Sequence, residues 1–151
     1  MIYTLERSQI LPVDADTLWH FLSRPENLNA ITPPQLHFTI RSSVPDRMFN
    51  GLLVEYRVRV PLFGTQGWLT EIKHIREGVS FVDEQREGPY KLWYHYHEVQ
   101  PHEAGSRMID RVTYKLPFGF LGDLVHALVI KRQLKTIFDY RESALFERFG
   151  R

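Results

Sequence analysis

Apolar and polar residues alternate along most of the chain before residue 117. The segment Leu52–Val60 is the clearest case, because every second residue is apolar and the residues between include Glu55 and two arginines. Successive side chains of a strand point to opposite faces, so this pattern predicts strands with one buried face. Such strands are predicted at Ile2–Leu11, Leu36–Ser43, Leu52–Val60, Gly67–Arg76, Val79–Arg86, Lys91–Gln100 and Arg107–Leu116.

Helical signals occupy the rest of the chain. Asp14 or Asp16 can cap a short helix over Ala15–Leu22, and Pro25 suits the first turn of a second short helix that ends before Pro33. After Pro117 the period becomes helical, which predicts one long helix from about Phe120 to Phe149. Its apolar stripe comprises Leu121, Leu124, Val125, Leu128, Leu134, Ile137, Phe138, Leu145 and Phe149.

The order of these elements predicts an α+β fold in a single domain over residues 1–151. Short connections, such as the turns predicted at Asn50-Gly51, Pro61 to Gly64 and Glu77-Gly78, favour an antiparallel sheet of about seven strands. One helix covers such a sheet only if the sheet curls around it, which leaves a pocket between them. A two-residue turn at Glu77-Gly78 would place Ile72 opposite Asp83 and Thr70 opposite Gln85.

The last three strands carry an unusual mixture on the face that should turn inward. Large apolar residues such as Phe81, Trp93 and Val112 alternate in phase with polar ones. The polar members of this inward face are Asp83, Gln85, His95, His97 and Asp110. Buried polar groups cost free energy unless they are paired or used, so these five residues form the candidate site.

Charge and composition narrow the function classes. A net charge of +1 argues against non-specific nucleic-acid binding, and the absence of cysteine removes disulfides, thiolate metal sites and cysteine nucleophiles. No signal peptide and no apolar run of ~20 residues is visible, so we expect a cytoplasmic protein without a membrane-spanning segment. Glycine-rich phosphate loops and the nucleophile-elbow motif are missing, which leaves nucleotide binding and triad hydrolysis without support.

Several motifs together resemble the SRPBCC superfamily, which includes START-like lipid carriers and polyketide cyclases/dehydrases. The matching stretches are Pro25-Glu26-Asn27-Leu28, Thr32-Pro33-Pro34, Gly51 with Tyr56, Trp68-Leu69-Thr70-Glu71-Ile72, Phe81-Val82-Asp83-Glu84-Gln85, Gly88-Pro89-Tyr90, Trp93-x-His95-x-His97, Asp110-x-Val112-x-Tyr114-x-Leu116-Pro117 and Gly122. They are most similar to an uncharacterised bacterial, cyclase/dehydrase-like subgroup. The resemblance implies the helix-grip fold and a small apolar or amphipathic ligand between sheet and helix. Because the subgroup is sometimes fused to sugar-nucleotide epimerase-like domains, it also implies association with such a protein.

Three functions are open for the polar residues. In the first, they orient an apolar ligand; the expected ligand-binding residues are Trp68, Thr70, Asp83, Gln85, Trp93, His95, His97, Asp110, Tyr114 and Arg141. In the second, His95 or His97 acts as a base that Asp110 or Asp83 orients, in a cyclase or dehydrase. In the third, the residues only brace the sheet.

Metal binding and two sets of basic residues receive weaker predictions. His95-x-His97 with an aspartate could supply three metal ligands, but the sequence reveals no partners to hold them, so neither metal nor cofactor is expected. Arg132 and Arg141 are expected on the solvated face of the long helix, with contact to a ligand carboxylate as the alternative. The remaining histidines are expected on the surface or helix flanks: His20, His37, His74, His102 and His126.

Overall fold

The computed structural model describes residues 1–60 and 63–150. Seven strands form one antiparallel sheet in the order β1-β7-β6-β5-β4-β3-β2. The strands are β1 (Tyr3–Leu11), β2 (Thr39–Ile40), β3 (Leu52–Val60), β4 (Gly64–Arg76), β5 (Ser80–Glu87), β6 (Leu92–His102) and β7 (Gly105–Lys115). The helices are α1 (Ala15–Leu22), the 3-10 helices η1 (Pro25–Ile31) and η2 (Pro34–Leu36), α2 (Gly119–Val125), the π segment η3 (His126–Ile130) and α3 (Lys131–Phe149).

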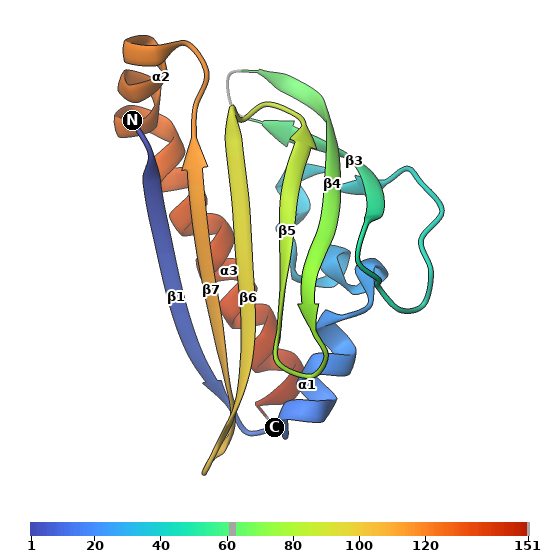
Figure 1. The fold of residues 1–151 in the computed structure, drawn as a ribbon. Coiled ribbons are helices and arrows are strands. Elements are labelled where there is room, and N and C mark those ends of the chain that lie inside the picture. Colours follow the sequence, from blue (N-terminus) through green and yellow to red (C-terminus); the bar gives the residue numbers. More distant parts are fainter. Residues whose placement is uncertain (61–62, 151) are drawn as a thin grey trace.

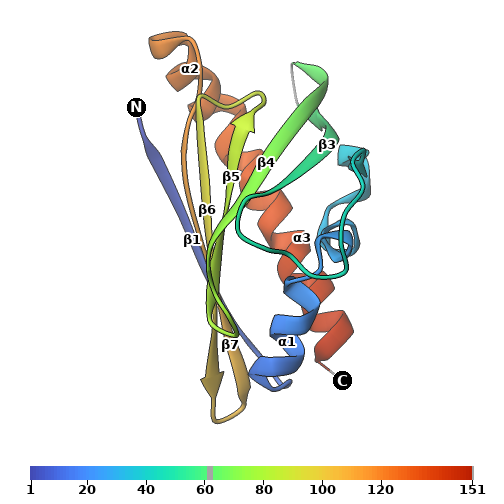
Figure 2. The same ribbon diagram turned by 45° about the vertical axis from the view of Figure 1, so that its right-hand side comes forward.

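The C-terminal helix lies across one face of the curved sheet, and α1 lies beside the C-terminal end of that helix (Figures 1 and 2). Asp14 caps α1, since its side chain accepts from the backbone N–H of Thr17 at 2.9 Å. The helix and sheet enclose two apolar cores. One contains Trp19 and Phe81, and the other contains Trp93 and Phe138. The predicted α+β order of a strand, two short helices, further strands and a long helix is therefore confirmed.

The predicted strand Leu36–Ser43 is mostly wrong. Only Thr39–Ile40 pairs with β3, and Pro34–Leu36 forms a 3-10 turn instead. Proline lacks a backbone N–H, so Pro33 and Pro34 cannot contribute a ladder of strand hydrogen bonds.

Pairing between β4 and β5 has the predicted register although the turn is different. Ile72 lies opposite Asp83 and Thr70 opposite Gln85, as predicted. The turn leaves three residues rather than two between the paired Arg76 and Ser80. An irregularity between Lys73 and Arg76 absorbs the extra residue. The other predicted turn, Pro61 to Gly64, falls partly outside the described residues, and β4 already begins at Gly64.

The long helix is confirmed, but the first part of its predicted apolar stripe is wrong. Leu121, Leu124 and Leu128 are 63%, 47% and 69% exposed. The buried positions instead recur every four residues: Gly122, His126, Ile130, Leu134 and Phe138. The π segment η3 uses an extra residue in its turn, and this rotates the leucines outward. Among the described helices, none has the length and hydropathy needed to cross a bilayer.

Candidate functional site

The polar residues of β6 and β7 do turn inward. His95 and His97 are 4% exposed and Asp110 is 6% exposed, while the residues beside them in sequence are more exposed. Strand register brings them together, because Asp83 lies opposite His95 and His97 opposite Asp110. The predicted inward face of this part of the sheet is confirmed.

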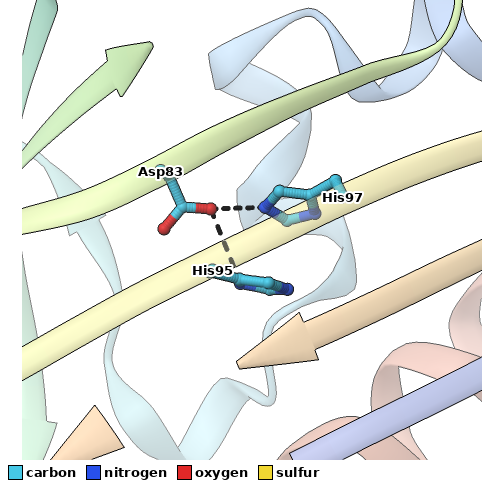
Figure 3. A group of neighbouring side chains, drawn as sticks. All are labelled: Asp83, His95 and His97. Atoms are coloured by element: carbon cyan, nitrogen blue, oxygen red, sulfur yellow. Dashed lines mark hydrogen bonds and ion pairs between the residues drawn. The ribbon is translucent and has the colours of Figure 1, made fainter. Parts of the chain in front are cut away.

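Two carboxylates flank two stacked imidazole rings. On one side, the Asp110 Oδ1 lies 2.8 Å from His95 Nε2 and 3.0 Å from His97 Nδ1. On the other side, Asp83 Oδ2 is hydrogen-bonded to His97 Nε2 and lies 3.5 Å from His95 Nδ1 (Figure 3). The ring centroids are 3.7 Å apart, with an angle of 29° between the planes. Each imidazole therefore spans the gap between the same two carboxylates.

Arg141 completes this group, which contradicts its expected place on the solvated face. It is 9% exposed, and its Nη2 lies 3.7 Å from Asp110 Oδ1 and 3.5 Å from His97 Nδ1. The sequence held a signal for this, since Arg141 comes three residues after Phe138 and four before Leu145, both of which are buried. We call Asp83, His95, His97, Asp110 and Arg141 the carboxylate–histidine cluster.

Burial and charge pairing compete within the cluster. Burial alone would raise the pKa of Asp110, but Arg141 and the two histidines hold it well below its ordinary value. Burial opposes protonation of His97, yet its hydrogen bonds to Asp110 and Asp83 raise its pKa above 6.5. For His95, burial and the neighbouring His97 lower the pKa, and the carboxylates do not fully offset them. The pKa values of the two stacked rings are thus shifted in opposite directions, upward for His97 and downward for His95.

The arrangement suits a shared proton better than a metal ion. Ligand atoms of Asp83, His95 and His97 lie within 4.8 Å of one another, and Asp110 could hold both rings from behind. An imidazole nitrogen, however, binds a metal along its lone pair, in the plane of the ring. The two rings are stacked with their centroids 3.7 Å apart, and Asp83 Oδ2 already lies against one nitrogen of each ring. Both rings would have to turn before one ion could bind them.

A cavity of about 150 Å³ reaches the cluster from between η1, β3, β4 and the long helix. Its wall is mainly apolar and aromatic, and its polar lining includes Asp83, His95 and Arg141. A second cavity of about 50 Å³ lies beside it and is lined by His97 together with Asp83 and Arg141. The Asp83 side chain, 21% exposed, lines both spaces, whereas Asp110 lines neither and sits behind the rings.

Four other predicted site residues have separate positions. Trp68 and Trp93 line the larger cavity, where the rings meet edge to face at 5.3 Å, and the Trp68 indole N–H donates to Thr70 at 3.1 Å. Gln85 does not join the cluster, because both ends of its amide bond the backbone of Tyr90 at 2.6 and 3.0 Å. Gln85 fixes the turn between β5 and β6.

Tyr114 belongs to another group, which also corrects the placement of His126. That histidine is 7% exposed rather than on the surface. Its Nε2 is 2.7 Å from the Tyr114 hydroxyl, and its ring stacks on Tyr3 at 3.5 Å. We call Tyr3, Tyr114 and His126 the His126 group. Neither Tyr114 nor His126 lines the larger cavity.

Sequence reasoning missed several cavity residues. Tyr56, Leu134 and Phe138 were recognised only as core positions, and Gln133 carried no signal. A core position and a cavity wall have the same apolar pattern, because both face away from solvent. Only the distance between η1 and the long helix decides which of them is open to a ligand.

Comparison with known proteins supports the fold alone. No protein-family model matches the chain, and no curated protein matches it in sequence. Among solved structures it is similar to TTHA0849 from Thermus thermophilus (TM-score 0.65, 17% identity, 98% of this chain and 99% of that one). It is also similar to Ara h 8.0201 (TM-score 0.62, 18% identity, 97% and 99%). A nucleoside-diphosphate sugar epimerase from Corynebacterium glutamicum matches 95% of this chain with 28% of its own (TM-score 0.68, 21% identity).

The chain has the helix-grip fold. An open antiparallel sheet of seven strands grips a helix over residues 119–149, with short helices after the first strand. This agrees with the structural neighbours over nearly the whole chain. The fold expected from the sequence motifs is confirmed, and the identities below 25% leave function to be argued from the site.

Proposed function

We propose that the protein binds a small, largely apolar molecule in the 150 Å³ cavity, with the carboxylate–histidine cluster orienting it. The observation that carries this proposal is an aromatic-lined cavity whose polar lining includes Asp83, His95 and Arg141. An apolar space of this size holds about one aromatic ring, and its open side admits a larger body. The Asp83 carboxylate accepts hydrogen bonds, so it favours a ligand with a hydroxyl group at its buried end.

Isothermal titration calorimetry with 2-naphthol tests this proposal. The probe carries two rings and one hydroxyl, and we expect a Kd on the order of 0.1 mM from about 0.5 kcal/mol per heavy atom. Val58→Trp should fill the cavity that Val58 lines and abolish binding. Arg57→Trp is the matched control, because Arg57 is exposed on the opposite face of the same strand. Equal binding by both variants, or none by the unmodified protein, would contradict the proposal.

A cyclase- or dehydrase-type activity is the second candidate, and one observation favours it. His95 lines the cavity with a lowered pKa, and Asp110 holds its Nε2 at 2.8 Å from behind. A neutral imidazole fixed by a carboxylate is suited to remove a proton next to a carbonyl group. The residues proposed for this role are His95 as the base, Asp110 as its orienting partner and His97 as the nearby proton donor.

Deuterium exchange into a bound ketone separates the two candidates. The rate at which 2-acetylnaphthalene exchanges its methyl protons in D2O is measured by NMR, with and without protein. A base at His95 predicts an accelerated rate that His95→Gln and Asp110→Asn reduce at least tenfold while the probe still binds. If exchange stays at the buffer rate, the protein is a binding protein. If the probe does not bind at all, the cluster only braces the sheet.

Association with a sugar-nucleotide epimerase-like protein is a further part of the proposal. It is supported by the epimerase of known structure in which this fold occupies 28% of the chain. The natural ligand would then be a molecule of the same sugar-nucleotide chemistry on which such a partner acts. Native mass spectrometry of protein purified from its own host is the direct way to identify both the bound ligand and the partner protein.

A further inference from the structure

The start of the long helix exposes a concentration of large apolar side chains. Thirteen such side chains are exposed in the described part of the chain, and five of them fall between residues 118 and 128. We call these five the apolar tip: Phe118 (70% exposed), Phe120 (79%), Leu121 (63%), Leu124 (47%) and Leu128 (69%). A concentration of exposed large apolar side chains indicates a surface that something covers.

The backbone is arranged so that the apolar tip faces outward. Leu124 and Leu128 are exposed at and before the π segment η3, while His126 and Ile130 in that segment are buried. Phe118 has φ 68 and ψ 23, a left-handed conformation that is strained for a bulky residue, and the residue is 70% exposed. Backbone strain that leaves an apolar ring exposed does not stabilise the fold, so we infer that the exposed ring has a function.

Positive charge adjoins the apolar tip. Lys131 and Arg132 follow Leu128 by about one turn and are exposed, and within the part of the chain described neither forms an ion pair. The acidic residue of this segment, Asp123, is bound to the N-terminal amine and to the Tyr3 hydroxyl. The tip therefore presents an apolar surface with a cationic border.

The dimensions fit the interface of a bilayer. The helical part of the tip extends from Phe120 to Leu128, which is about 12 Å along a helix axis. Amphipathic helices bury their apolar face ~5–10 Å deep, at the level where the acyl chains begin. With the tip inserted at an angle, Lys131 and Arg132 lie at the level of the lipid phosphates, where anionic lipids attract cations.

We propose that the apolar tip, with Lys131 and Arg132 behind it, docks the protein on the surface of an anionic lipid membrane. This attachment is peripheral and reversible, since the patch is short. It is independent of the ligand cavity, so either proposal can fail without the other.

Vesicle flotation tests the docking. Untagged protein is mixed with vesicles of phosphatidylcholine alone or with a quarter of phosphatidylglycerol, and the floated fraction is measured. We expect binding mainly to the anionic vesicles, with the affinity falling as salt is raised. Leu124→Ser with Leu128→Ser should lower the affinity at least tenfold. Lys131→Glu with Arg132→Glu should abolish the preference for anionic lipid.

The matched control removes equally exposed apolar groups elsewhere. Leu53→Ser with Phe146→Ser changes side chains that are 51% and 59% exposed but lie outside the tip. This variant should float like the unmodified protein. The proposal is overturned if the unmodified protein does not float, or if the control loses as much binding as the tip variant. It is also overturned if sedimentation shows a dimer that only the tip variant dissociates, because a second copy would then cover the patch.

Discussion

The protein buries histidines in two places, and the two groups differ in how the polar ring is accommodated. In the carboxylate–histidine cluster, His95 and His97 lie between ionised partners and border open space. In the His126 group, the ring stacks on Tyr3 and meets the neutral hydroxyl of Tyr114. A buried histidine with a hydrogen bond is therefore not by itself a functional signal. Contact with a cavity and a balance of opposite charges distinguish the cluster.

Removing the cation from the cluster should have the largest effect on stability. Arg141→Met leaves the buried Asp110 carboxylate without its positive partner on the helix, which should cost about 3–5 kcal/mol of unfolding free energy. Arg132→Met changes an exposed arginine of the same helix and should stay within about 0.5 kcal/mol. Urea unfolding at neutral pH measures both. A loss for Arg141→Met no larger than that of its control would show that the histidines alone neutralise Asp110.

Removing both partners should cost less than the two single changes together. Asp110→Asn keeps the shape of the side chain but removes the charge that Arg141 faces, so the double variant contains no unpaired ion. We expect the losses to fall short of additivity by about 1–3 kcal/mol in the same urea experiment. Strictly additive losses would mean that Arg141 contributes through packing on Phe138 rather than through charge.

The His126 group should tolerate substitution better. His126→Phe preserves stacking on Tyr3 and loses the bond to the Tyr114 hydroxyl, which should cost about 0.5–1.5 kcal/mol. His97→Phe is the matched change in the cluster, and it should cost more because two carboxylates lose their shared donor. If the two variants unfold at the same urea concentration, the contrast between the groups is not energetic.

The smallest effect is a difference in pH dependence. The pKa of His97 is raised, so its protonated form stabilises the fold fully below about 6.5, and this is lost as pH rises through the folded-state pKa. Burial is the main cause that lowers the pKa of His126, and the positive charge of Lys131 lowers it further. Its contribution is present above about 6.5 and is lost as pH falls through the folded-state pKa. NMR titration of the imidazole protons should place His97 above, and His126 and His95 below, the unfolded value.

Prediction from sequence was most successful where the signal was local. Alternation placed His95, His97 and Asp110 on the buried face, since side-chain direction in a strand follows directly from residue parity. The pairing of Ile72 with Asp83 was also predicted, although the turn that leads to it was not. Register is specified by the match of buried faces, and an irregularity at His74 and Ile75 absorbs the difference in turn length.

Prediction failed where a residue is compatible with both a buried and a solvent-exposed position. Arg141 and His126 have polar heads that favour solvent. The spacing of Arg141 to Phe138 and Leu145 indicates a buried position, but no local pattern identifies the buried partners that Arg141 and His126 bind. Leu121, Leu124 and Leu128 were assigned to the core because their mutual spacing of three and four residues fits a helical period. The π segment shifts the buried positions to Gly122 and His126, and at Gly122 a Cβ would lie 2.0 Å from the Pro117 carbonyl oxygen.

The sequence by itself determined the order of the elements, the face that each long strand buries and the presence of polar residues on that face. These depend on the periodicity and turn chemistry of consecutive residues. Tertiary structure alone decided that Arg141 joins two aspartates and two histidines, that a cavity remains beside them, and that the helix begins with exposed leucines. Each of these depends on distances between segments far apart in the chain, which no local pattern encodes.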